Sequence, residues 1–564
     1  MHIRKIGILT RTYRHANRYR QVLTVLVRHG FGDLVERLHV GEFIEIGMKL
    51  FPRVRPGYIE RLSRVERVRM ALEKLGPTFV KLGQILSTRP DLVSADLIRE
   101  LSKLQDKVPP FPYQQVEKII AAELGRPVSA IFSEIDEQPL AAASIGQVHR
   151  ARLSNGDDVI VKVQRPSVRS SVEIDLEILL HLAMLIEKHV EEIAWYRPTK
   201  IVEEFARTIE KEMDYTRELA NAERFARLFM ADPTIYVPRV YREFSTERVL
   251  VMECIDGVKV SRIDELEAKG YDRKLIASRG AEVILDQVFE HGFFHADPHP
   301  GNIFILPGNI LCFLDFGMMG AIDRNSKEDL GDMLYALVNR DEAKAVKALL
   351  KVVESDREPD RPVLEADVAN FMELYLYRPL KEIRFEQLLE QLLDLVARHR
   401  LRLSFDRFLM LKALAVMEGV GLMLDPDLDM AEKAAPYIRK LMKQRYDPRR
   451  VINDFFLSAA DFLKLVKIFP GEFQEILKQI KLGQLKFGFE HRGLDRFISE
   501  MDRSSNRISV ALLISSLIIG SSLIIQVNIG PQFMGLSLLG IIGFLIAALF
   551  GLWLIISIVR SGRL

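Results

Sequence analysis

Two neighbouring stretches carry the residues best suited to chemistry: HADPHPGN, which ends at Asn302, and DFG, which begins at Asp315. Asp297 precedes Asn302 by five positions, and Asp315 follows Asn302 by thirteen, which leaves room for one β-hairpin. Phosphoryl transfer from a nucleotide uses such a set, because one aspartate orients the attacking hydroxyl group while an asparagine and a second aspartate hold Mg²⁺. A single aspartate in a loop is usually a turn residue, so the prediction depends on the ordered set.

A lysine at the end of the strand-like run VIVK, Lys162, lies upstream of both stretches. In a protein kinase this lysine binds the α- and β-phosphates and pairs with a helix glutamate. Four glutamates of EKEMDYTRELANAERF are candidates for that partner, and most of them are expected to be solvent-facing charges: Glu210, Glu212, Glu218 and Glu223. The place of the Gly-rich phosphate loop of a kinase is taken by Ala141, Ala142, Ala143 and Ser144. The order of these motifs predicts a protein-kinase-like nucleotide site with an altered loop.

His295 and His299 lie four positions apart around Asp297, so a metal site is one interpretation. They belong to a loop and not to a helix face, and the sequence offers no third ligand nearby. We therefore favour a structural role in which His295 bonds to the backbone of the loop.

A further motif, KLGQ, lies in a predicted helix near residue 80. Lys81 and Gln84 are three positions apart and share a helix face. Gly83 inside a helix costs ~1 kcal/mol relative to alanine, so its presence indicates a packing or a functional reason.

The elements that must position these residues change type along the chain. Residues 57–126 read as helices: Pro77 begins one, Ser94 caps the next, and Gly125 ends the last. Two β-type runs, SIGQVHRARL and DDVIVKVQ, then flank Ser154-Asn155-Gly156, which is a hairpin signal. The later predicted elements are helices at 166–190, about 199–230 and about 273–291, strands in VPRVYREFS and RVLVMECI, and a strand–turn–strand unit over residues 293–320. After it the chain reads as almost all helix to about residue 490.

The composition sets limits on the class of protein. The chain has 564 residues, 48% of them apolar, which fits three or four domain-sized units with a large core. The formal net charge is only +2, so no global field favours nucleic acid. Two distant cysteines, Cys254 and Cys312, exclude a disulfide framework and a cysteine-based zinc site, and suit a reducing compartment.

The two ends of the chain differ in composition from the rest. Residues 1–30 hold seven Lys or Arg residues and no acid, which suits either a basic helix on an anionic membrane surface or a solvated basic face. The run 508–559 holds no charge and no histidine, and the turn NIGPQ divides it into spans at 508–527 and about 533–559. Arginines flank both outer ends, so both ends and the large domain are expected on the cytoplasmic side. Small residues would let the spans pack closely: Ser515, Ser516, Gly520, Ser521, Gly535, Gly540 and Gly543.

Taken together, the chain resembles the UbiB family of atypical kinases, the group tied to ubiquinone biosynthesis. The resemblance covers roughly residues 57–320 and 508–559, and the stretches that carry it are KLGQILSTRPDL, LQDKVPP, AAASIGQVHRA, VKVQRP, EMDYTRELAN, FFHADPHPGN and DFGMMG. It implies an α+β, protein-kinase-like bilobal fold with an N-terminal helical extension and a C-terminal two-helix transmembrane hairpin. The expected division is a basic region (1–56), a helical extension with the KxGQ motif (57–130), a kinase-like domain (131–490), a linker (491–507), and the hairpin with a short basic tail (508–564).

The resemblance also implies roles for single residues. Asp297, Lys162 and Glu218 would be catalytic, with Glu218 the partner of Lys162. Asn302 and Asp315 would hold Mg²⁺. The nucleotide would lie against Ala141, Ala142, Ala143, Ser144, Val148, Lys162 and Glu253. The KxGQ residues Lys81, Gly83 and Gln84 would lie over the nucleotide, where they block ordinary protein phosphorylation, and the ExD residues Glu212 and Asp214 would face them, with Glu212 the partner of Lys81.

The activity implied by the resemblance is that of a membrane-anchored kinase or ATPase that uses Mg-ATP (or ADP) and is required for ubiquinone biosynthesis, where it assists lipid-intermediate handling or a biosynthetic complex. The expected location is the bacterial inner membrane. The expected partners are anionic membrane lipids and quinone-precursor lipids, with biosynthetic enzymes and a second copy of the chain as further candidates and no nucleic acid. Two alternatives stay open: a small-molecule kinase, because HADPHPGN also resembles the H-G-D-x-H-x-x-N loop of aminoglycoside and choline kinases, and a non-catalytic lipid-binding pseudokinase scaffold.

Overall fold

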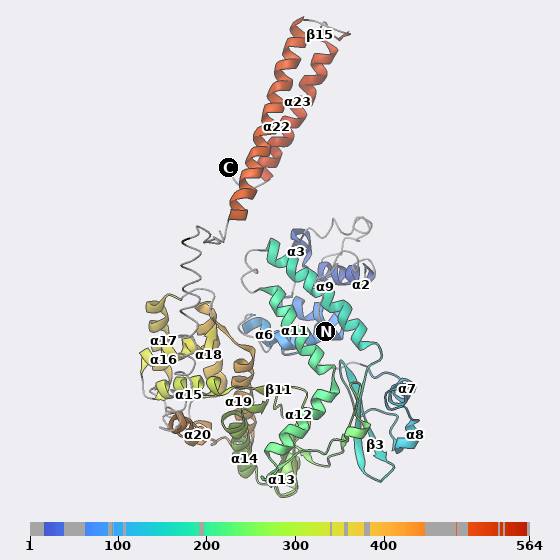
Figure 1. The fold of residues 1–564 in the computed structure, drawn as a ribbon, viewed down its shortest axis with the longest axis vertical. Coiled ribbons are helices and arrows are strands. Elements are labelled where there is room, and N and C mark those ends of the chain that lie inside the picture. The colour runs from blue at the N-terminus through green and yellow to red at the C-terminus, as the bar shows by residue number, and fades with distance from the viewer. Residues whose placement is uncertain are drawn as a thin grey trace. The chain divides into compact units, whose positions relative to one another are not determined.

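The computed structural model of the chain describes residues 16–38, 62–87, 93, 95–104, 109–190, 197–338, 341–354, 359–376, 384–445, 481, 494–527, 531–533 and 536–560. The chain divides into two compact units, Met1–Ile452 and Asn453–Leu564, which we call the N-terminal and C-terminal units (Figure 1). The predicted sites all lie in the N-terminal unit.

A five-stranded antiparallel sheet forms the first lobe of the N-terminal unit. Its strands are β1 (Phe132–Ile135), β2 (Ala141–Ala142), β3 (Gly146–Leu153), β4 (Asp158–Gln164) and β6 (Val249–Glu253). The order is β1-β3-β4-β6, and β2 pairs with β3 beside that path. The predicted hairpin joins β3 to β4, with Gly156 at φ +94° in the turn. Glycine adopts this left-handed backbone without the steric cost that a side chain brings.

Alternation along β4 decides which way Lys162 faces. Val159, Val161 and Val163 are completely buried and pack on one side of the sheet against α7 (Tyr113–Leu124) and α8 (Val128–Ile131). Successive side chains on a strand point to opposite faces, so Lys162 faces the other side, where α12 (Tyr215–Leu228) packs (Figure 1).

A group of helices lies in the sequence before the first strand of this sheet and between β4 and β6. Its members are α2 (Ala16–Arg28), α3 (Gly32–Arg37), α4 (Arg64–Leu75), α5 (Pro77–Ser87), α6 (Ala95–Leu101), α9 (Val168–His189) and α11 (Pro198–Glu212). Ser63 and Glu66 form a capping box that starts α4, and Gly76 at φ +101° separates it from α5, which Pro77 begins as predicted.

Helix α2 bears on the membrane-surface interpretation of residues 1–30. Its residues Tyr19, Val22 and Leu23 are buried and pack with side chains of α4, α5 and α9. The apolar face of α2 is therefore covered by the protein, which argues against a membrane-surface role for residues 16–28. Residues 1–15 lie outside the described part of the chain.

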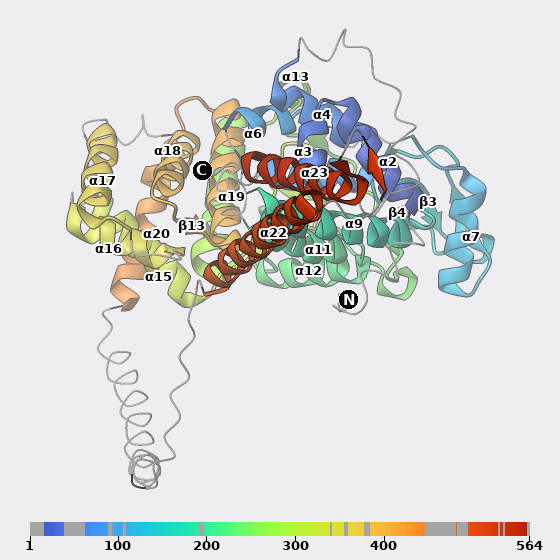
Figure 2. The ribbon, with the colours of Figure 1, turned by 90° about the horizontal axis from the view of Figure 1, so that it is seen from above.

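The described part of the second lobe is mainly helical around three small sheets. One sheet has the order β5-β10-β9-β7, another pairs β8 with β11, and the third pairs β12 (Val353–Glu354) with β13 (Arg402–Leu403). The other strands are β5 (Ile235–Tyr236), β7 (Val258–Lys259), β8 (Phe293–His295), β9 (Ile303–Leu306), β10 (Ile310–Phe313) and β11 (Met319–Ala321). The helices are α13 (Ile263–Ala268), α14 (Arg273–Leu285), α15 (Arg324–Val338), α16 (Glu342–Val352), α17 (Arg361–Leu376), α18 (Phe385–Arg398), α19 (Phe405–Leu424) and α20 (Met430–Arg445). Figure 2 shows α15 to α18 and α20 gathered beside α19, away from α7 and β3.

Two sequence expectations for this unit are wrong in detail. The helix expected at about 199–230 is two helices, because the helix ends before Met213. Asp214 then caps α12 by accepting a hydrogen bond from the Thr216 amide. VPRVYREFS is not a strand: it holds one isolated bridge, Val240 to Met252, and a short 3₁₀ turn at Arg242–Phe244. Pro238 has no N–H group to donate to a ladder, which explains the interruption.

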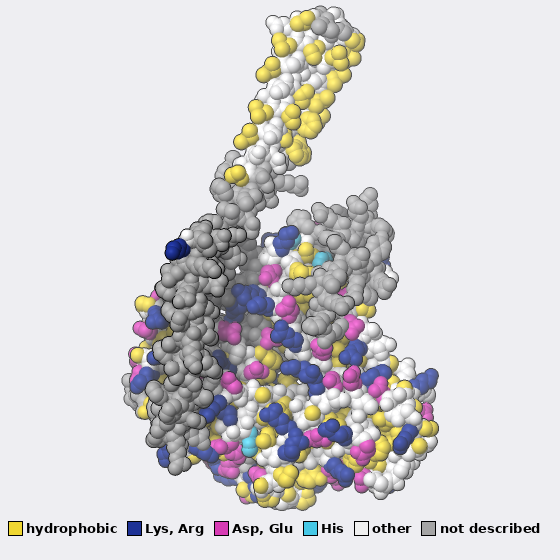
Figure 3. All heavy atoms as spheres, in the orientation of Figure 1, with side chains coloured by type: hydrophobic (Ala, Val, Ile, Leu, Met, Phe, Trp, Pro, Cys, Tyr) yellow, Lys and Arg dark blue, Asp and Glu magenta, His cyan; other side chains and the backbone are white. Residues whose placement is uncertain are grey.

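The C-terminal unit is a helical hairpin of α22 (Leu494–Val527) and α23 (Leu538–Arg560), with the two-residue strands β14 (Gln532–Phe533) and β15 (Leu536–Ser537) between them. Two segments, 504–527 and 538–555, are long and apolar enough to cross a membrane. Large apolar side chains of the hairpin are exposed, among them Leu512, Leu545 and Trp553. Figure 3 shows apolar side chains along the visible face of the hairpin. The expected polar linker is in fact helical from residue 494, since α22 begins there.

The helices α22 and α23 pack through small residues, but only through some of those predicted. A side chain on Gly540 would meet Ile525, and one on Gly543 would meet Ser521. Ser515 and Ser516 instead bond to carbonyl groups of their own helix, and Gly520 has open space beside it. Gly535 lies outside the described residues.

Candidate functional site

Lys162 and Glu218 form a buried ion pair between β4 and α12. Lys162 Nζ lies 2.8 Å from Glu218 Oε2 and 3.0 Å from Oε1, and the Glu218 side chain is only 7% exposed. Burial alone would lower the pKa of Lys162, but the carboxylates of Glu218 and Asp315 raise it above the ordinary lysine value. The ammonium group therefore stays charged at neutral pH. Of the other glutamate candidates, Glu223 pairs with Arg242, and Glu212 pairs with Lys81.

The DFG segment that begins at Asp315 is held against the same helix through Phe316. Asp315 Oδ1 accepts a hydrogen bond from the Gly317 amide (2.9 Å). Burial alone would raise the pKa of Asp315, but Lys162 and the Gly317 amide lower it below the ordinary value, so the carboxylate is ionised. Asn221, one turn after Glu218 on α12, donates to the Phe316 carbonyl (2.9 Å). The helix that supplies the partner of Lys162 thus also holds the DFG segment.

Asn302 and Asp315 lie at the open end of the β9–β10 hairpin, opposite its turn. Asn302 immediately precedes β9, and its carbonyl accepts a hydrogen bond from the Leu314 amide (3.0 Å), next to Asp315. Because Ile303 pairs with Phe313 in the ladder, Asn302 and Asp315 flank one end of the hairpin. These are the two oxygen-donor side chains that the sequence singled out for Mg²⁺.

His295 and His299 both accept hydrogen bonds from backbone amides of the loop. The Asp297 amide donates to His295 Nδ1 (3.2 Å), and the Gly301 amide donates to His299 Nδ1 (3.1 Å). Among the described residues, no group of three or more His, Cys, Asp or Glu side chains is arranged to hold a metal. The interpretation of His295 as a structural histidine is confirmed, and its burial lowers its pKa, so the ring is neutral.

The alanine loop is closed by hydrogen bonds. Ala141 and Ala142 pair as β2 with Val148 and Gln147, and the Ala143 amide donates to the Gly146 carbonyl (2.8 Å). Arg165, which the sequence did not single out, donates from Nε to the Ala143 carbonyl (3.0 Å). Ser144 is 3% exposed. Hydrogen bonds therefore hold the backbone at Ala143 through both its amide and its carbonyl group.

Val148 and Glu253 were predicted to contact the nucleotide. Val148 lies on β3 directly opposite Lys162. Glu253 ends β6, and its carboxylate accepts hydrogen bonds from the Tyr236 hydroxyl (2.8 Å) and the Arg239 amide (3.0 Å). The side chain of Glu253 is thus occupied within the protein, and its amide donates to the Arg239 carbonyl (2.8 Å), so any nucleotide contact there would fall to its backbone carbonyl.

The KLGQ motif sits on α5. Lys81 Nζ lies 3.0 Å from Glu212 Oε1, and Gln84 Nε2 donates to the Leu104 carbonyl (3.3 Å). A side chain on Gly83 would clash with Leu104 and Leu72. Close packing therefore explains why a glycine stands inside this helix. Asp214, the other residue of the ExD pair, caps α12 and pairs with Arg217 at 3.4 Å.

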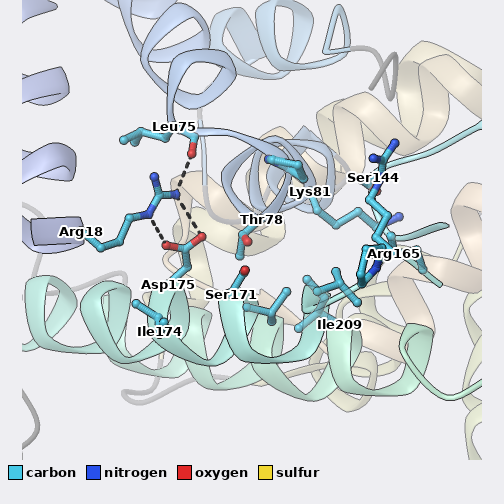
Figure 4. Close-up of a pocket in the computed structure, with 15 residues that line it drawn as sticks. Arg18, Leu75, Thr78, Lys81, Ser144, Arg165, Ser171, Ile174, Asp175 and Ile209 are labelled. Atoms are coloured by element: carbon cyan, nitrogen blue, oxygen red, sulfur yellow. Dashed lines mark hydrogen bonds and ion pairs between the residues drawn. The ribbon is translucent and has the colours of Figure 1, made fainter. Parts of the chain in front are cut away.

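A cavity of about 460 Å³ opens beside Lys81, between α5 and α9. At one end Arg18 bonds to Asp175 (2.8 Å), and at the other end lie Lys81, Ser144 and Arg165 (Figure 4). Most of the wall between these ends is apolar. Lys162, Asp297 and Asp315 do not line it.

Asp297 has an ion-pair partner that the sequence did not predict. Lys412, on α19, places Nζ 3.0 Å from Asp297 Oδ1. The two residues are 115 positions apart, so no local motif links them. The one local signal is that Lys412 interrupts an apolar run of α19, between Leu411 and Ala413. A charge inside such a run indicates a partner of opposite charge but does not say which residue it is.

Three parts of the chain match known family models. The sequence matches an ABC1 atypical kinase-like domain over residues 103–349, a UbiB helical domain over 368–429, and an ABC1/UbiB kinase-like C-terminal domain over 492–560. It is 37% identical over 506 residues to a probable protein kinase UbiB of Aeromonas salmonicida, covering 88% of this chain and 90% of that protein. It is 38% identical over 447 residues to a probable protein kinase UbiB of Cellvibrio japonicus, covering 78% and 79%. The chain belongs to the ABC1/UbiB family of atypical kinase-like proteins.

Two further proteins are similar to this UbiB-family member over most of their own lengths. An uncharacterized protein in the hydrogenase 1 5′ region of Clostridium pasteurianum is 33% identical over 548 residues, which is 97% of this chain and 99% of that protein. Among solved structures, the complex of Rv3197 with erythromycin from Mycobacterium tuberculosis is 24% identical, with a TM-score of 0.42, and covers 57% of this chain and 84% of that one. As a UbiB-family member, the chain has a kinase-like fold with sheets, many helices and two apolar C-terminal helices.

Proposed function

We propose that this chain is a membrane-anchored, Mg-ATP-dependent atypical kinase or ATPase that supports ubiquinone biosynthesis by assisting the handling of lipid intermediates. The observation that carries the proposal is the Lys162–Glu218 ion pair, with Asp315 ionised beside it. A charged lysine and an ionised aspartate are what a nucleotide phosphate and its Mg²⁺ require.

The residues present fit Mg-ATP. Lys162 would bind the phosphates, and Asn302 with Asp315 would hold Mg²⁺, whose remaining oxygen ligands would come from the nucleotide and water. Bound Mg-ATP supplies a transferable phosphoryl group. Asp297 would orient the acceptor, and α12 would keep Lys162 and the DFG segment in place through Glu218 and Asn221.

The cavity beside Lys81 supports the lipid part of the proposal. Its volume of about 460 Å³ falls in the range of small-molecule sites, which are mostly apolar with a few polar groups at defined places. A substituted phenol, as in quinone precursors, combines an apolar ring and chain with one polar group. The polar end would lie at the Lys81 and Arg165 end of the cavity (Figure 4).

ATP turnover by the detergent-solubilised full chain tests the activity. We expect Mg-dependent phosphate release that rises with anionic lipid and a quinone-precursor phenol. Asp297→Asn should abolish this turnover and, in cells, quinone production, while Asp427→Asn, at a side chain 88% exposed, should leave both unchanged. Wild-type quinone levels in the Asp297→Asn strain would contradict the proposal.

Two neighbouring serines allow a matched test of the cavity. Ser171, on α9, lines the cavity, whereas Ser170 does not, and both are exposed and bond to the Ser167 carbonyl. Ser171→Trp should remove stimulation by the phenol without changing basal turnover, and Ser170→Trp should retain the stimulation. Equal stimulation of both variants would exclude this cavity as the phenol site.

Product analysis separates the alternatives. Phosphate appearing on a soluble small molecule would favour the small-molecule kinase, and absence of turnover with every lipid tested would favour the pseudokinase scaffold. Location is tested by protease treatment: with the N-terminal unit in the cytoplasm, inverted inner-membrane vesicles should lose it and sealed spheroplasts should keep it. The flanking residues Arg507 and Arg560 support that orientation.

A further inference from the structure

Lys412 lies outside every motif of the kinase-like region. It belongs to α19, in the segment that matches the UbiB helical domain, whereas Asp297 lies in the ABC1 kinase-like match. The ion pair of 3.0 Å therefore joins two parts of the family architecture. Lys412 is 21% exposed and the Asp297 side chain is 44% exposed.

The surroundings of Lys412 argue against a chance surface pair. Its neighbours on α19 are buried: Leu411 is 7% exposed and Ala413 is 0% exposed. Burying an ammonium group among apolar residues is costly unless a partner offsets the lost hydration. The helix is anchored in the core, so the backbone that carries the Lys412 side chain is fixed.

The loop around Asp297 carries no cation of its own. Between Asp297 and Asn302 stand Pro298, His299, Pro300 and Gly301. Lys162 and Lys81 are engaged with Glu218 and Glu212. Among the residues that the structure describes, Lys412 is the only one that forms an ion pair with Asp297.

We propose that Lys412 is a positioning residue for Asp297. By holding Oδ1 it fixes the carboxylate so that Oδ2 faces the phosphoryl acceptor, and the helical region thereby completes the catalytic loop. This inference rests on the proposed ATP-dependent function. A misplacement of about 1 Å in a reacting group can cost roughly 100-fold in rate, so a residue that acts only through Asp297 can still control turnover.

The test uses the full chain in detergent and three variants. Lys412→Met removes the ion pair, Lys412→Arg restores a cation, and Lys433→Met is the matched control. Lys433 pairs with Glu282 at 2.6 Å between α20 and α14, and neither residue belongs to the catalytic loop. Should Lys412→Met fail to fold, Lys412→Gln, which keeps a hydrogen-bond donor without the charge, takes its place.

The first readout needs no nucleotide. Hydrogen exchange of a peptide spanning 293–303 should become faster in Lys412→Met, recover in Lys412→Arg, and stay at the wild-type rate in Lys433→Met. Unchanged exchange in Lys412→Met, or an equal change in the control, would overturn the positioning role whatever the activity of the protein.

The second readout is kinetic. Lys412→Met should lower kcat roughly 10- to 100-fold with KM for ATP nearly unchanged, and Lys412→Arg should recover part of the loss. A raised KM for ATP with kcat unchanged would mean that Lys412 acts in nucleotide binding and not through Asp297. Absence of turnover in the wild type would instead count against the proposed function, and the exchange experiment would still decide the role of Lys412.

Discussion

Lys81 of the KLGQ helix and Glu212, the last residue of α11, form an ion pair of 3.0 Å in which both side chains are mostly buried. Glu212 is followed after one residue by Asp214, the N-cap of α12, and α12 supplies Glu218. The helix that carries KLGQ and the helix that pairs with Lys162 are thus connected through one short turn. A disturbance of the Lys81–Glu212 contact is expected to reach the nucleotide lysine.

The first prediction concerns that contact. Lys81→Met should loosen α5 and raise autophosphorylation of the protein, because the acceptor side of the site becomes accessible, and Lys81→Arg should stay near wild type. Labelled ATP and a gel of the full chain measure it. Equal labelling of all three proteins would mean that α5 does not restrict access.

The second prediction concerns the alanine loop. Ala143→Gly should alter the Kd for nucleotide by about two- to fivefold, the equivalent of the ~0.5–1 kcal/mol that separates glycine from alanine in backbone freedom. Ala142→Gly should act in the same direction, and autophosphorylation should change with it. Ala122→Gly, at an exposed position of α7, should lower stability by ~1 kcal/mol with no change in that Kd. If neither loop variant changes affinity or autophosphorylation, the loop does not tune the site.

A third prediction compares two helix glycines. Gly83→Val should destabilise the protein by about 1–3 kcal/mol, because the added atoms clash with Leu104 and Leu72. Gly419→Ala, on an exposed position of α19 with open space beside it, should stabilise by about 0.4–1 kcal/mol. Urea unfolding of the detergent-solubilised chain gives both values. A neutral Gly83→Val would show that α5 shifts to accommodate the side chain.

The fourth prediction is a pH dependence from Glu418. Burial raises the pKa of Glu418 to about 7, and the Phe385 amide donates to it at 2.6 Å. Between the ordinary pKa and about 7 the folded chain keeps a proton that the unfolded chain has lost, so the free energy of unfolding falls as pH rises through this window. Glu418→Gln should remove that slope and stabilise the protein at pH 8 by about 1–3 kcal/mol. Glu432→Gln, at an exposed residue, should keep the slope, and a slope retained in Glu418→Gln would refute the assignment.

The first-lobe sheet, the β3–β4 hairpin and the order of the site residues could be predicted from the sequence, because these depend on local patterns. Asn-Gly turns, alternating valines and D-x₄-N spacing act over a few residues. The break at Met213 was missed because the helical period continues through it, although Asp214 is a common N-cap type. Arg165 and Lys412 were missed for another reason: their partners are chosen by tertiary packing, and no spacing rule connects Lys412 with Asp297.

The ion pair between Asp297 and Lys412 also has a consequence for the folding of the chain during its translation. A ribosome makes the chain from the N-terminus, so Lys162, Glu218, Asn302 and Asp315 are all made before Lys412. A nascent chain that has already formed its first lobe still lacks the partner of Asp297 until the 115th residue after Asp297 has been added. The order of translation would thus delay a complete site until the helical region has been made.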